Sequence, residues 1–168
     1  MFYDIRPSDA ERFSKYFEKT DESSCWEWTG AKNRKGYGNF HFNGTCVAAY
    51  RFSYALAHSG IIPDGYMIDH KCFNPACVNP SHLRLATAKQ NGEHRKGPNT
   101  NSRSGVLGVY YRKDRRQWQA CIRANGRNYR KGPFKRKSEA AKAARELRNM
   151  LYTFNDLDRT DDEMRGMR

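Results

Sequence analysis

The clearest pattern of hydrophobic and polar positions lies in the C-terminal third of the chain. Three runs there have the composition and alternation of short β-strands, and turn-forming residues at 114–115 and 125–126 separate them. The Asn-Gly pair at 125–126 is a strong signal for a hairpin. We therefore expect a three-stranded antiparallel sheet that consists of residues 106–113, 117–124 and 127–134.

A helix is expected to follow this sheet. Ser138 favours the N-cap position, and Glu139 suits the positive end of the helix dipole. Apolar residues then recur at helical spacing, namely Ala140, Ala144, Leu147 and Leu151. The helix should use this apolar face to cover one side of the sheet.

Strand alternation divides the side chains of the sheet between two faces. Trp118, Ala120 and Ile122 are expected to face the helix. The opposite face is polar and basic, and it is expected to carry Tyr110, Arg112, Gln119, Cys121, Arg123 and Arg130. A ribbon of this kind fits the major groove of DNA, where arginines bind guanine edges or phosphates.

The N-terminal part of the chain predicts a unit of strand, loop, strand and helix. Residues 66–70 and 82–86 are expected to form the strands. The Thr-x-x-Gln sequence at 87–90 has the form of a capping box, so a helix begins there with Asn91 in its first turns. Two further helices are expected at 9–19 and 48–58.

This arrangement can bring Asp69, His70 and Asn91 together, although Asn91 follows His70 by 21 positions. Hard divalent cations such as Mg²⁺ or Mn²⁺ take oxygen ligands, which Asp69 and Asn91 could supply. Such an ion would polarise a phosphate and stabilise the leaving oxygen. His70, with an ordinary pKa of about 6.5, is suited to take a proton from the attacking water. Spacing alone leaves open the alternative that these residues form hydrogen-bonded structure at a strand end.

A second candidate site lies in the loop between these two strands. Cys72, Cys77 and His82 follow one another at x4 spacing, and Cys25 could supply a fourth ligand for a structural zinc ion. The alternative is that the two loop cysteines are small buried hydrophobes and that His82 is a hydrogen-bonded loop residue. His94 is a reserve metal ligand, because it lies one helical step from Asn91.

Composition narrows the class of protein. The chain has 168 residues, 38% hydrophobic and 29% charged, which is enough for one ordinary domain or two small ones. It lacks a run of the ~20 apolar residues that a membrane span needs, and it begins without the pattern of a secretion signal, so we expect a soluble cytoplasmic protein with no membrane partner. Five cysteines make a poor disulfide framework and fit reduced thiols or metal ligands better.

The net charge of +13 is concentrated in one segment. Residues 91–137 hold 14 Lys or Arg and two acidic residues, whereas the rest of the chain is nearly neutral. Positive charge that is concentrated in this way attracts a polyanion, and nucleic acid is the commonest polyanion. The alternative is a solvated basic face without a partner.

A polar, turn-rich stretch at 96–104 is expected to be a linker. It divides the chain into an N-terminal domain at 1–95 and a C-terminal domain at 105–155, followed by an acidic tail at 156–168, in which residues 156–163 are expected to be disordered. All five histidines lie in the first of these domains, so the chemistry is expected there.

The N-terminal domain resembles the HNH endonucleases, and more narrowly their phage and intron-encoded homing type. The resemblance spans about residues 10–95 and rests on Cys25-Trp26-Glu27-Trp28-Thr29-Gly30, Gly36-Tyr37-Gly38, Ile68-Asp69-His70-Lys71-Cys72, Asn74 to Leu83, and Thr87 to Asn91. It implies a ββα-metal site in which His70 is the general base and Asp69 and Asn91 bind the divalent ion. It also places Arg51 near the phosphate, since similar nucleases carry Ala-His-Arg where this chain has Ala49-Tyr50-Arg51. The chain departs from the family at His82, where an Asn often braces the loop.

The C-terminal domain resembles the Apetala-two DNA-binding domain over about residues 104–152. The resemblance rests on Ser104 to Tyr110, Trp118 to Arg123, Gly132-Pro133-Phe134 and Ser138 to Ala141. It implies that the sheet enters the major groove and that arginines contact DNA. The candidate contacts are Arg112, Arg115, Arg116, Arg123, Arg127 and Arg130. Cys121 stands where plant members often have an acidic residue, so their base preference does not carry over.

Together these features predict an α+β protein that acts as a site-specific endonuclease on double-stranded DNA. Its C-terminal sheet would find the site, and its N-terminal metal centre would hydrolyse a phosphodiester. One metal centre per chain predicts nicking by a monomer or double-strand cutting by a homodimer. The alternative is a non-catalytic, zinc-stabilised DNA-binding regulator. An RNA-directed nuclease is disfavoured, because the predicted sheet lacks paired exposed aromatic residues for stacking splayed bases.

Overall fold

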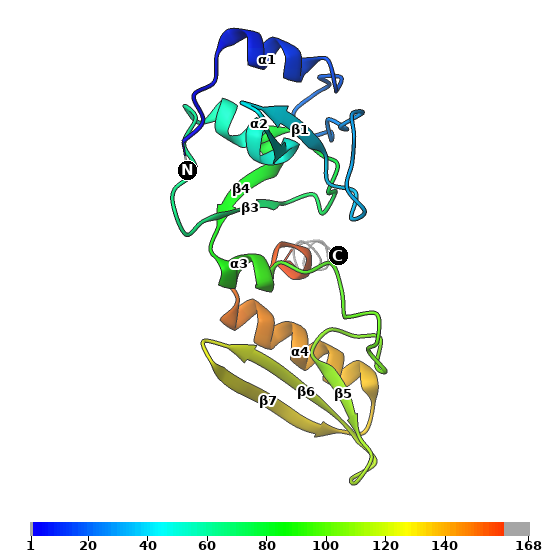
Figure 1. Cartoon of the computed structure of the whole chain (residues 1–168). Coiled ribbons are helices and arrows are strands. Elements are labelled where there is room, and N and C mark those ends of the chain that lie inside the picture. The colour runs from blue at the N-terminus through cyan, green and yellow to red at the C-terminus, as the bar shows by residue number, and fades with distance from the viewer. Residues whose placement is uncertain (1, 160–168) are drawn as a thin grey trace. The chain divides into compact units, whose positions relative to one another are not determined.

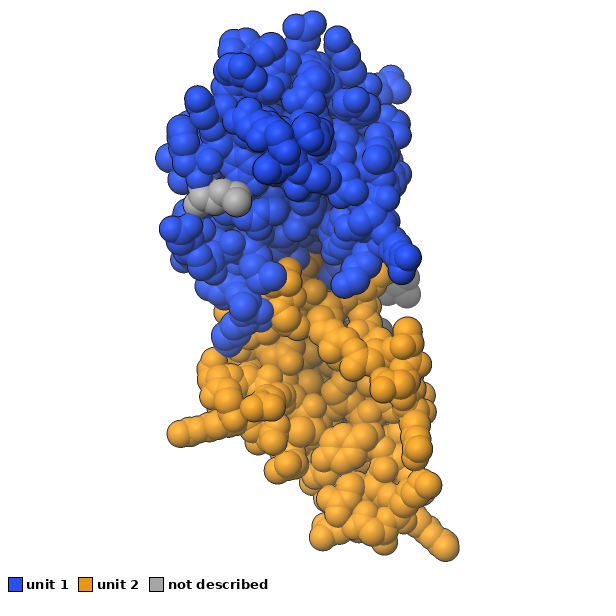
Figure 2. All heavy atoms as spheres, viewed as in Figure 1, with its two compact units in different colours: residues 1–89 blue, residues 90–168 orange. Residues whose placement is uncertain are grey.

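The computed structural model describes residues 2–159 and divides the chain into two compact units, residues 1–89 and 90–168 (Figure 2). The division falls inside the short helix α3, Ala88–Glu93. The stretch 96–104, expected to be a linker, contains turns and no helix or strand. None of the helices among the described residues is both long and apolar enough to cross a membrane.

The first unit contains two β-hairpins and two longer helices (Figure 1). The helices are α1, Pro7–Ser14, and α2, Ala49–Ala57. In one hairpin β1, Asn39–Phe42, pairs with β2, Thr45–Ala48. In the other β3, Met67–His70, pairs antiparallel with β4, Leu83–Ala86, and a 3₁₀ turn at Pro80–His82 leads into β4.

Aromatic side chains fill the core of the first unit. Phe13, Trp28, Phe40 and Phe52 are all buried, and the rings of Phe13 and Phe52 lie 4.8 Å apart. Gly38 is required beside Trp28, because a Cβ atom at this position would lie 2.5 Å from the indole ring. Most of this cluster comes from residues that precede the β3–β4 hairpin, and the hairpin packs onto it through Ile68 and Leu83.

The two helices predicted for this unit agree with the structure to different degrees. Helix α2 agrees with the prediction to within one residue at each end. Helix α1 ends at Ser14 rather than at residue 19. The carbonyl of Tyr16 accepts hydrogen bonds from the amide and the hydroxyl of Thr29, at 2.7 and 2.8 Å, which draws the chain away from the helical path.

The second unit is a three-stranded antiparallel sheet covered on one face by a helix (Figure 1). The strand order is β5, Val109–Arg112, then β6, Gln117–Ala124, then β7, Arg127–Phe134. The covering helix is α4, Lys137–Leu151. The mixed α+β class and this sheet with its helix are as the sequence predicts.

Strand β5 starts three residues later than predicted. Gly108, with φ of 76°, precedes it, and a Cβ atom there would lie 2.3 Å from the side chain of Ile122. The chain therefore bends closely over the core at this glycine and pairs with β6 only from Val109 onward.

Helix α4 begins before Ser138, so Ser138 is not its N-cap. Arg136 occupies that position, and its amide donates to the carboxylate of Glu139 at 3.2 Å. The expected contribution of Glu139 to the first turn is therefore present, with a different residue as the cap.

The start of the acidic segment is packed against α4. The guanidinium of Arg148, buried to 6% exposure, donates to both carboxylate oxygens of Asp158, at 2.6 and 3.0 Å. The expectation of a disordered tail is therefore wrong for residues 156–159, because Asp158 neutralises this buried arginine. Residues 160–168 of the predicted tail lie outside the described residues.

Candidate metal centre and active site

The segment that carries Cys25 pairs with the loop between β3 and β4. The amide of Trp28 donates to the carbonyl of Ala76, and the amide of Val78 donates to the carbonyl of Trp26, each at 2.9 Å. Trp28 is anchored in the aromatic core, so this pairing fixes the position of the loop. The result places Cys25 beside residues that follow it by about 50 positions.

The four residues expected to bind zinc converge in the structure. The sulfur atoms of Cys25, Cys72 and Cys77 and one ring nitrogen of His82 all lie within 4.8 Å of one another. Nδ1 of His82 is 3.6 Å from both Cys25 Sγ and Cys77 Sγ. A tetrahedral zinc ion, with Zn–S near 2.3 Å and Zn–N near 2.0–2.1 Å, would separate sulfur and nitrogen ligands by about 3.6 Å. The donor set and its spacing therefore fit a tetrahedral metal site.

The thiols in this cluster have strongly perturbed acidities. A hydrogen bond from Cys77 lowers the pKa of Cys72 to about 5, whereas the same interaction raises the pKa of Cys77. Burial raises the pKa of Cys25. Three sulfur atoms this close together cannot all ionise unless a cation compensates their charge, so a bound metal ion would resolve this conflict.

Asn79 braces the loop that carries the cluster. Its side chain is completely buried and donates to the carbonyls of Glu22 and Ser24, at 3.0 and 2.8 Å. Its amide oxygen accepts from the backbone N–H of Ser81 at 2.9 Å. Asn79 thus ties the loop to the segment just before Cys25.

Asp69 and Arg84 form a partly buried ion pair across the second hairpin. They are directly opposite in the strand register, and Nε of Arg84 donates to Oδ2 of Asp69 at 2.9 Å. Asp69 is only 6% exposed, and the guanidinium offsets the cost of placing its carboxylate in a poorly solvated position. A charged carboxylate is the form that a divalent cation needs.

His70 is buried next to Asp69, and the loop between β3 and β4 orients its ring. Its Nε2 lies 3.1 Å from the carbonyl oxygen of Cys77. A carbonyl oxygen only accepts hydrogen bonds, so Nε2 carries the proton and Nδ1 keeps its lone pair. The ring packs against Tyr50, with the centroids 4.7 Å apart. Burial lowers the pKa of His70, so the ring is neutral at pH 7 and able to accept a proton.

Asn91 lies on α3 and falls in the second unit, whereas Asp69 and His70 belong to the first. Its convergence with those two residues stays a prediction. His94, the reserve ligand, is buried and lies 3.4 Å from Asp156 of the second unit. The cluster of metal-ligating residues found among residues 2–159 does not include it.

The candidate DNA contacts differ in their surroundings. Arg112 binds Asp114 through two hydrogen bonds, at 2.9 and 2.7 Å, while Arg115 and Arg116 lie in the exposed turn after β5. Arg123 and Arg130 stand exposed on the open face of the sheet. Arg127 pairs with Ala124 and so shares the face that points toward α4, away from the other candidates. In the first unit Arg51 lies on α2, next to Tyr50.

The sequence analysis missed Asn79, Arg84 and Tyr50. Asn79 had a local signal, since an Asn followed by Pro is a common start for a helical turn. Arg84 could have been found by aligning the two predicted strands in register. The contact of Tyr50 with His70 depends on how α2 packs against the hairpin, for which the sequence holds no local signal.

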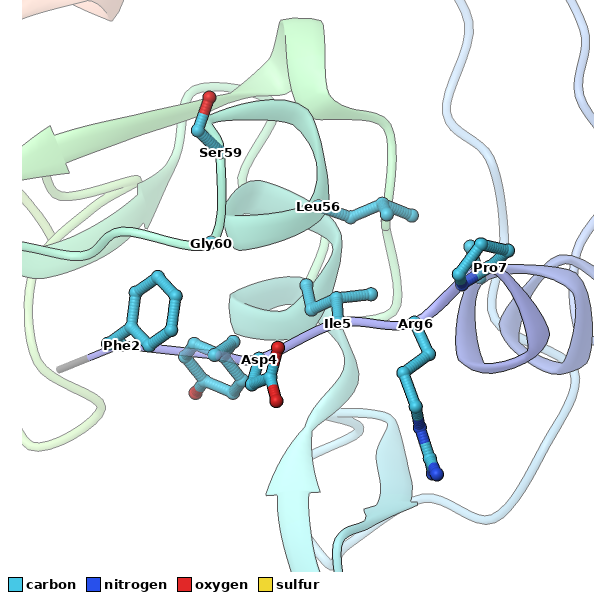
Figure 3. A pocket seen from close by; sticks show the side chains of 10 residues that line it. Phe2, Asp4, Ile5, Arg6, Pro7, Leu56, Ser59 and Gly60 are labelled. Atoms are coloured by element: carbon cyan, nitrogen blue, oxygen red, sulfur yellow. The ribbon is translucent and has the colours of Figure 1, made fainter.

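A cavity of about 350 Å³ lies at the N-terminus of the first unit (Figure 3). Residues 2–7 and the end of α2 line it, including Phe2, Ile5 and Leu56. None of the candidate catalytic or metal-binding residues lies among its walls. The candidate catalytic and metal-binding residues therefore lie outside this cavity.

Comparison with known proteins supports the nuclease assignment of this region. Residues 54–93 match the HNH endonuclease family, and this range contains the β3–β4 hairpin, Asp69, His70, Asn91 and three of the four clustered metal-ligating residues. Residues 54–93 are thus similar to an HNH endonuclease domain.

Similar proteins occur in bacteriophages. Protein 7.7 of Escherichia phage T7 is 45% identical over 69 residues, which are 41% of this chain and 52% of that protein. Protein 2.8 of the same phage is 40% identical over 73 residues, 44% of this chain and 50% of that protein. Protein 3.8 is 38% identical over 73 residues, 44% of this chain and 60% of that protein. The chain thus spans about half the length of the curated relatives it matches, and no solved structure matches it significantly.

Proposed function

We propose that this protein is a site-specific DNA endonuclease of the homing type, in which His70 is the general base. The hydrogen bond from His70 Nε2 to the carbonyl of Cys77 carries this proposal. It fixes the tautomer in which Nδ1 can remove a proton, and the depressed pKa keeps that nitrogen unprotonated at neutral pH.

The residues around His70 suit the hydrolysis of a phosphodiester. Asp69 and Asn91 would hold a divalent ion, Mg²⁺ or Mn²⁺, which when bound stabilises negative charge on the phosphate and the leaving oxygen. Arg84 donates to the Asp69 carboxylate across the hairpin and holds it in position. His70 takes the proton from the attacking water, and Arg51 binds a phosphate near the cut. By resemblance to the family, the products carry a 5′-phosphate and a 3′-hydroxyl.

The Cys25, Cys72, Cys77 and His82 cluster is proposed to hold a structural zinc ion. Its four donors occupy all positions of a tetrahedron, so no coordination site is left for substrate. The ion would fix the loop whose Cys77 carbonyl orients His70. Cys25, Cys72, Cys77 and His82 would thus, with zinc bound, hold the loop that orients the proposed base.

The second unit is proposed to supply recognition of double-stranded DNA, as its resemblance to the Apetala-two domain implies. Its open sheet face is basic, and phosphate contacts together with base contacts there would select the target. One catalytic centre per chain nicks as a monomer or cuts both strands as a homodimer. The phage relatives suggest action in the cytoplasm of an infected cell.

A plasmid assay tests the nuclease proposal against the alternative of a DNA-binding regulator. The purified chain should convert supercoiled plasmid to nicked or linear forms when Mg²⁺ is added, and should not do so with EDTA. A third reaction omits Mg²⁺ but contains no EDTA, so that a structural zinc ion stays in place. It separates the need for Mg²⁺ from the loss of zinc. Asn91→Ala should lose cleavage at all Mg²⁺ concentrations or require far more Mg²⁺. Binding of DNA without cleavage in any arm would favour the regulator.

A further inference from the structure

Gln119 occupies the middle of the open face of the sheet in the second unit. It lies on the central strand β6, directly opposite Tyr110 of β5. The Tyr110 hydroxyl donates a hydrogen bond of 2.7 Å to Oε1 of Gln119. Both side chains are partly buried, and Tyr110 fixes the side-chain amide of Gln119 from the β5 side.

On the other side of Gln119 the sheet is irregular. Trp118 pairs with Phe134 and Ala120 pairs with Lys131, so β7 places two residues, Gly132 and Pro133, opposite the single Gln119. This is a β-bulge, and it leaves Gln119 without a cross-strand partner in register on β7. Bulges of this kind commonly re-aim a side chain beside a functional site.

The hydrogen bond from Tyr110 decides which part of the Gln119 amide is presented outward. Its oxygen is engaged by the hydroxyl, so the two N–H donors of Nε2 are left to interact beyond the sheet. In the major groove, guanine, adenine and thymine offer acceptor atoms at their edges, whereas cytosine offers only a donor. An oriented N–H donor therefore discriminates against cytosine.

The charged neighbours of Gln119 on this face are arginines. Cys121, two residues along β6, is paired with Arg130, and Arg123 follows on the same face. Among residues 2–159, neither arginine has an ion pair with an acidic side chain, in contrast to Arg112 with Asp114. Arg123 and Arg130 can therefore bind DNA without first breaking a salt bridge.

We propose that Gln119 is a specificity-determining residue that reads an acceptor edge at one base pair of the target, with Tyr110 as its positioning residue. This inference rests on the proposed function, in which the second unit binds duplex DNA through this face. It assigns base readout to Gln119, whereas Arg123 and Arg130 supply most of the affinity.

Selection from a randomised duplex library tests this inference with the full-length chain in the absence of Mg²⁺, so that bound DNA is not cut. The wild type should enrich a motif with one position at which cytosine on the contacted strand is disfavoured. Gln119→Ala should reduce that discrimination about tenfold, which is typical of one lost base contact. Gln117→Ala is the matched control, because Gln117 lies on the same face and strand and should leave the preference unchanged.

Two further variants separate readout from a structural effect. Gln119→Glu presents acceptors in place of donors, so the preference at the same position should shift toward cytosine. Tyr110→Phe keeps the ring but frees the amide, and should weaken discrimination at that position alone. A wild type that enriches no motif would overturn the proposed function of the second unit. A wild-type motif that Gln119→Ala and Gln119→Glu leave intact would overturn the role of Gln119 only.

Discussion

Cys77 and His70 are joined by a hydrogen bond of 3.1 Å between the carbonyl oxygen of the cysteine and Nε2 of the histidine. The sulfur of the same cysteine lies 3.6 Å from Nδ1 of His82, inside the cluster of metal-ligating residues. One residue thus belongs to the candidate metal site through its side chain and orients the candidate base through its backbone. Substitutions in the cluster should therefore alter the orientation of the His70 ring.

The first prediction concerns metal content. The purified chain should contain one zinc ion per molecule by elemental analysis, and Cys77→Ser should lose most of it, because three ligands hold zinc far less tightly than four. Cys46→Ser is the matched control, since Cys46 is exposed and lies outside the cluster. Equal zinc content in both variants, or none in the wild type, would speak against a zinc site here.

The second prediction concerns the brace formed by Asn79. Asn79→Ala removes three hydrogen bonds from a fully buried position and leaves two carbonyls and one amide without their partner. The free energy of unfolding should fall by about 2–4 kcal/mol. Urea denaturation measures it, with Asn128→Ala on the exposed sheet face as the control. A loss no larger than that of the control would show that the brace contributes little.

The third prediction concerns the pair of Asp69 and Arg84. Arg84→Ala leaves a carboxylate of 6% exposure without its guanidinium, so the free energy of unfolding should fall by about 3 kcal/mol. A double-mutant cycle with Asp69→Ala should give a coupling energy of about 1–3 kcal/mol. Additive effects of the two substitutions would mean that the two side chains do not stabilise each other.

The fourth prediction concerns Arg123 on the open face of the sheet. Arg123→Ala should weaken binding to the cognate duplex about tenfold while cleavage at saturating DNA changes little, because this residue is proposed to bind DNA and not to take part in hydrolysis. Titration by fluorescence anisotropy measures the affinity. Lys142→Ala, a change of equal charge on α4 rather than on the sheet, serves as the comparison. Unchanged affinity would remove Arg123 from the set of contacts.

Local patterns predicted the second unit well and the first unit only in part. The bounds of β6 and β7 follow from strand alternation and from the Asn-Gly turn between them, which are properties of neighbouring residues. Helix α4 started early because a capping interaction of Arg136 with Glu139 outcompeted the favourable residue Ser138. Pairing partners far apart in sequence were harder to predict.

The candidate site shows the same limit. The sequence correctly nominated Cys25 as the fourth member of the cluster, yet not the pairing of residues 26–28 with 76–78 that brings it there. The bonds of Asn79 to Glu22 and Ser24 join segments 55 or more positions apart, for which no periodic pattern exists. Catalysis, the metal ions and the DNA contacts stay predictions from residue chemistry and resemblance.

His70 is proposed to act as the base for DNA cleavage, and paired measurements of cleavage and of DNA affinity isolate this role. His70→Ala and His41→Ala, a control at an exposed histidine, are compared with the wild type for plasmid cleavage in Mg²⁺ and for DNA affinity without Mg²⁺. His70→Ala should lose cleavage by at least about 100-fold and keep its affinity and zinc content, while His41→Ala should behave as the wild type. Cleavage by His70→Ala at the wild-type rate, or loss of binding and cleavage together, would contradict this role of His70.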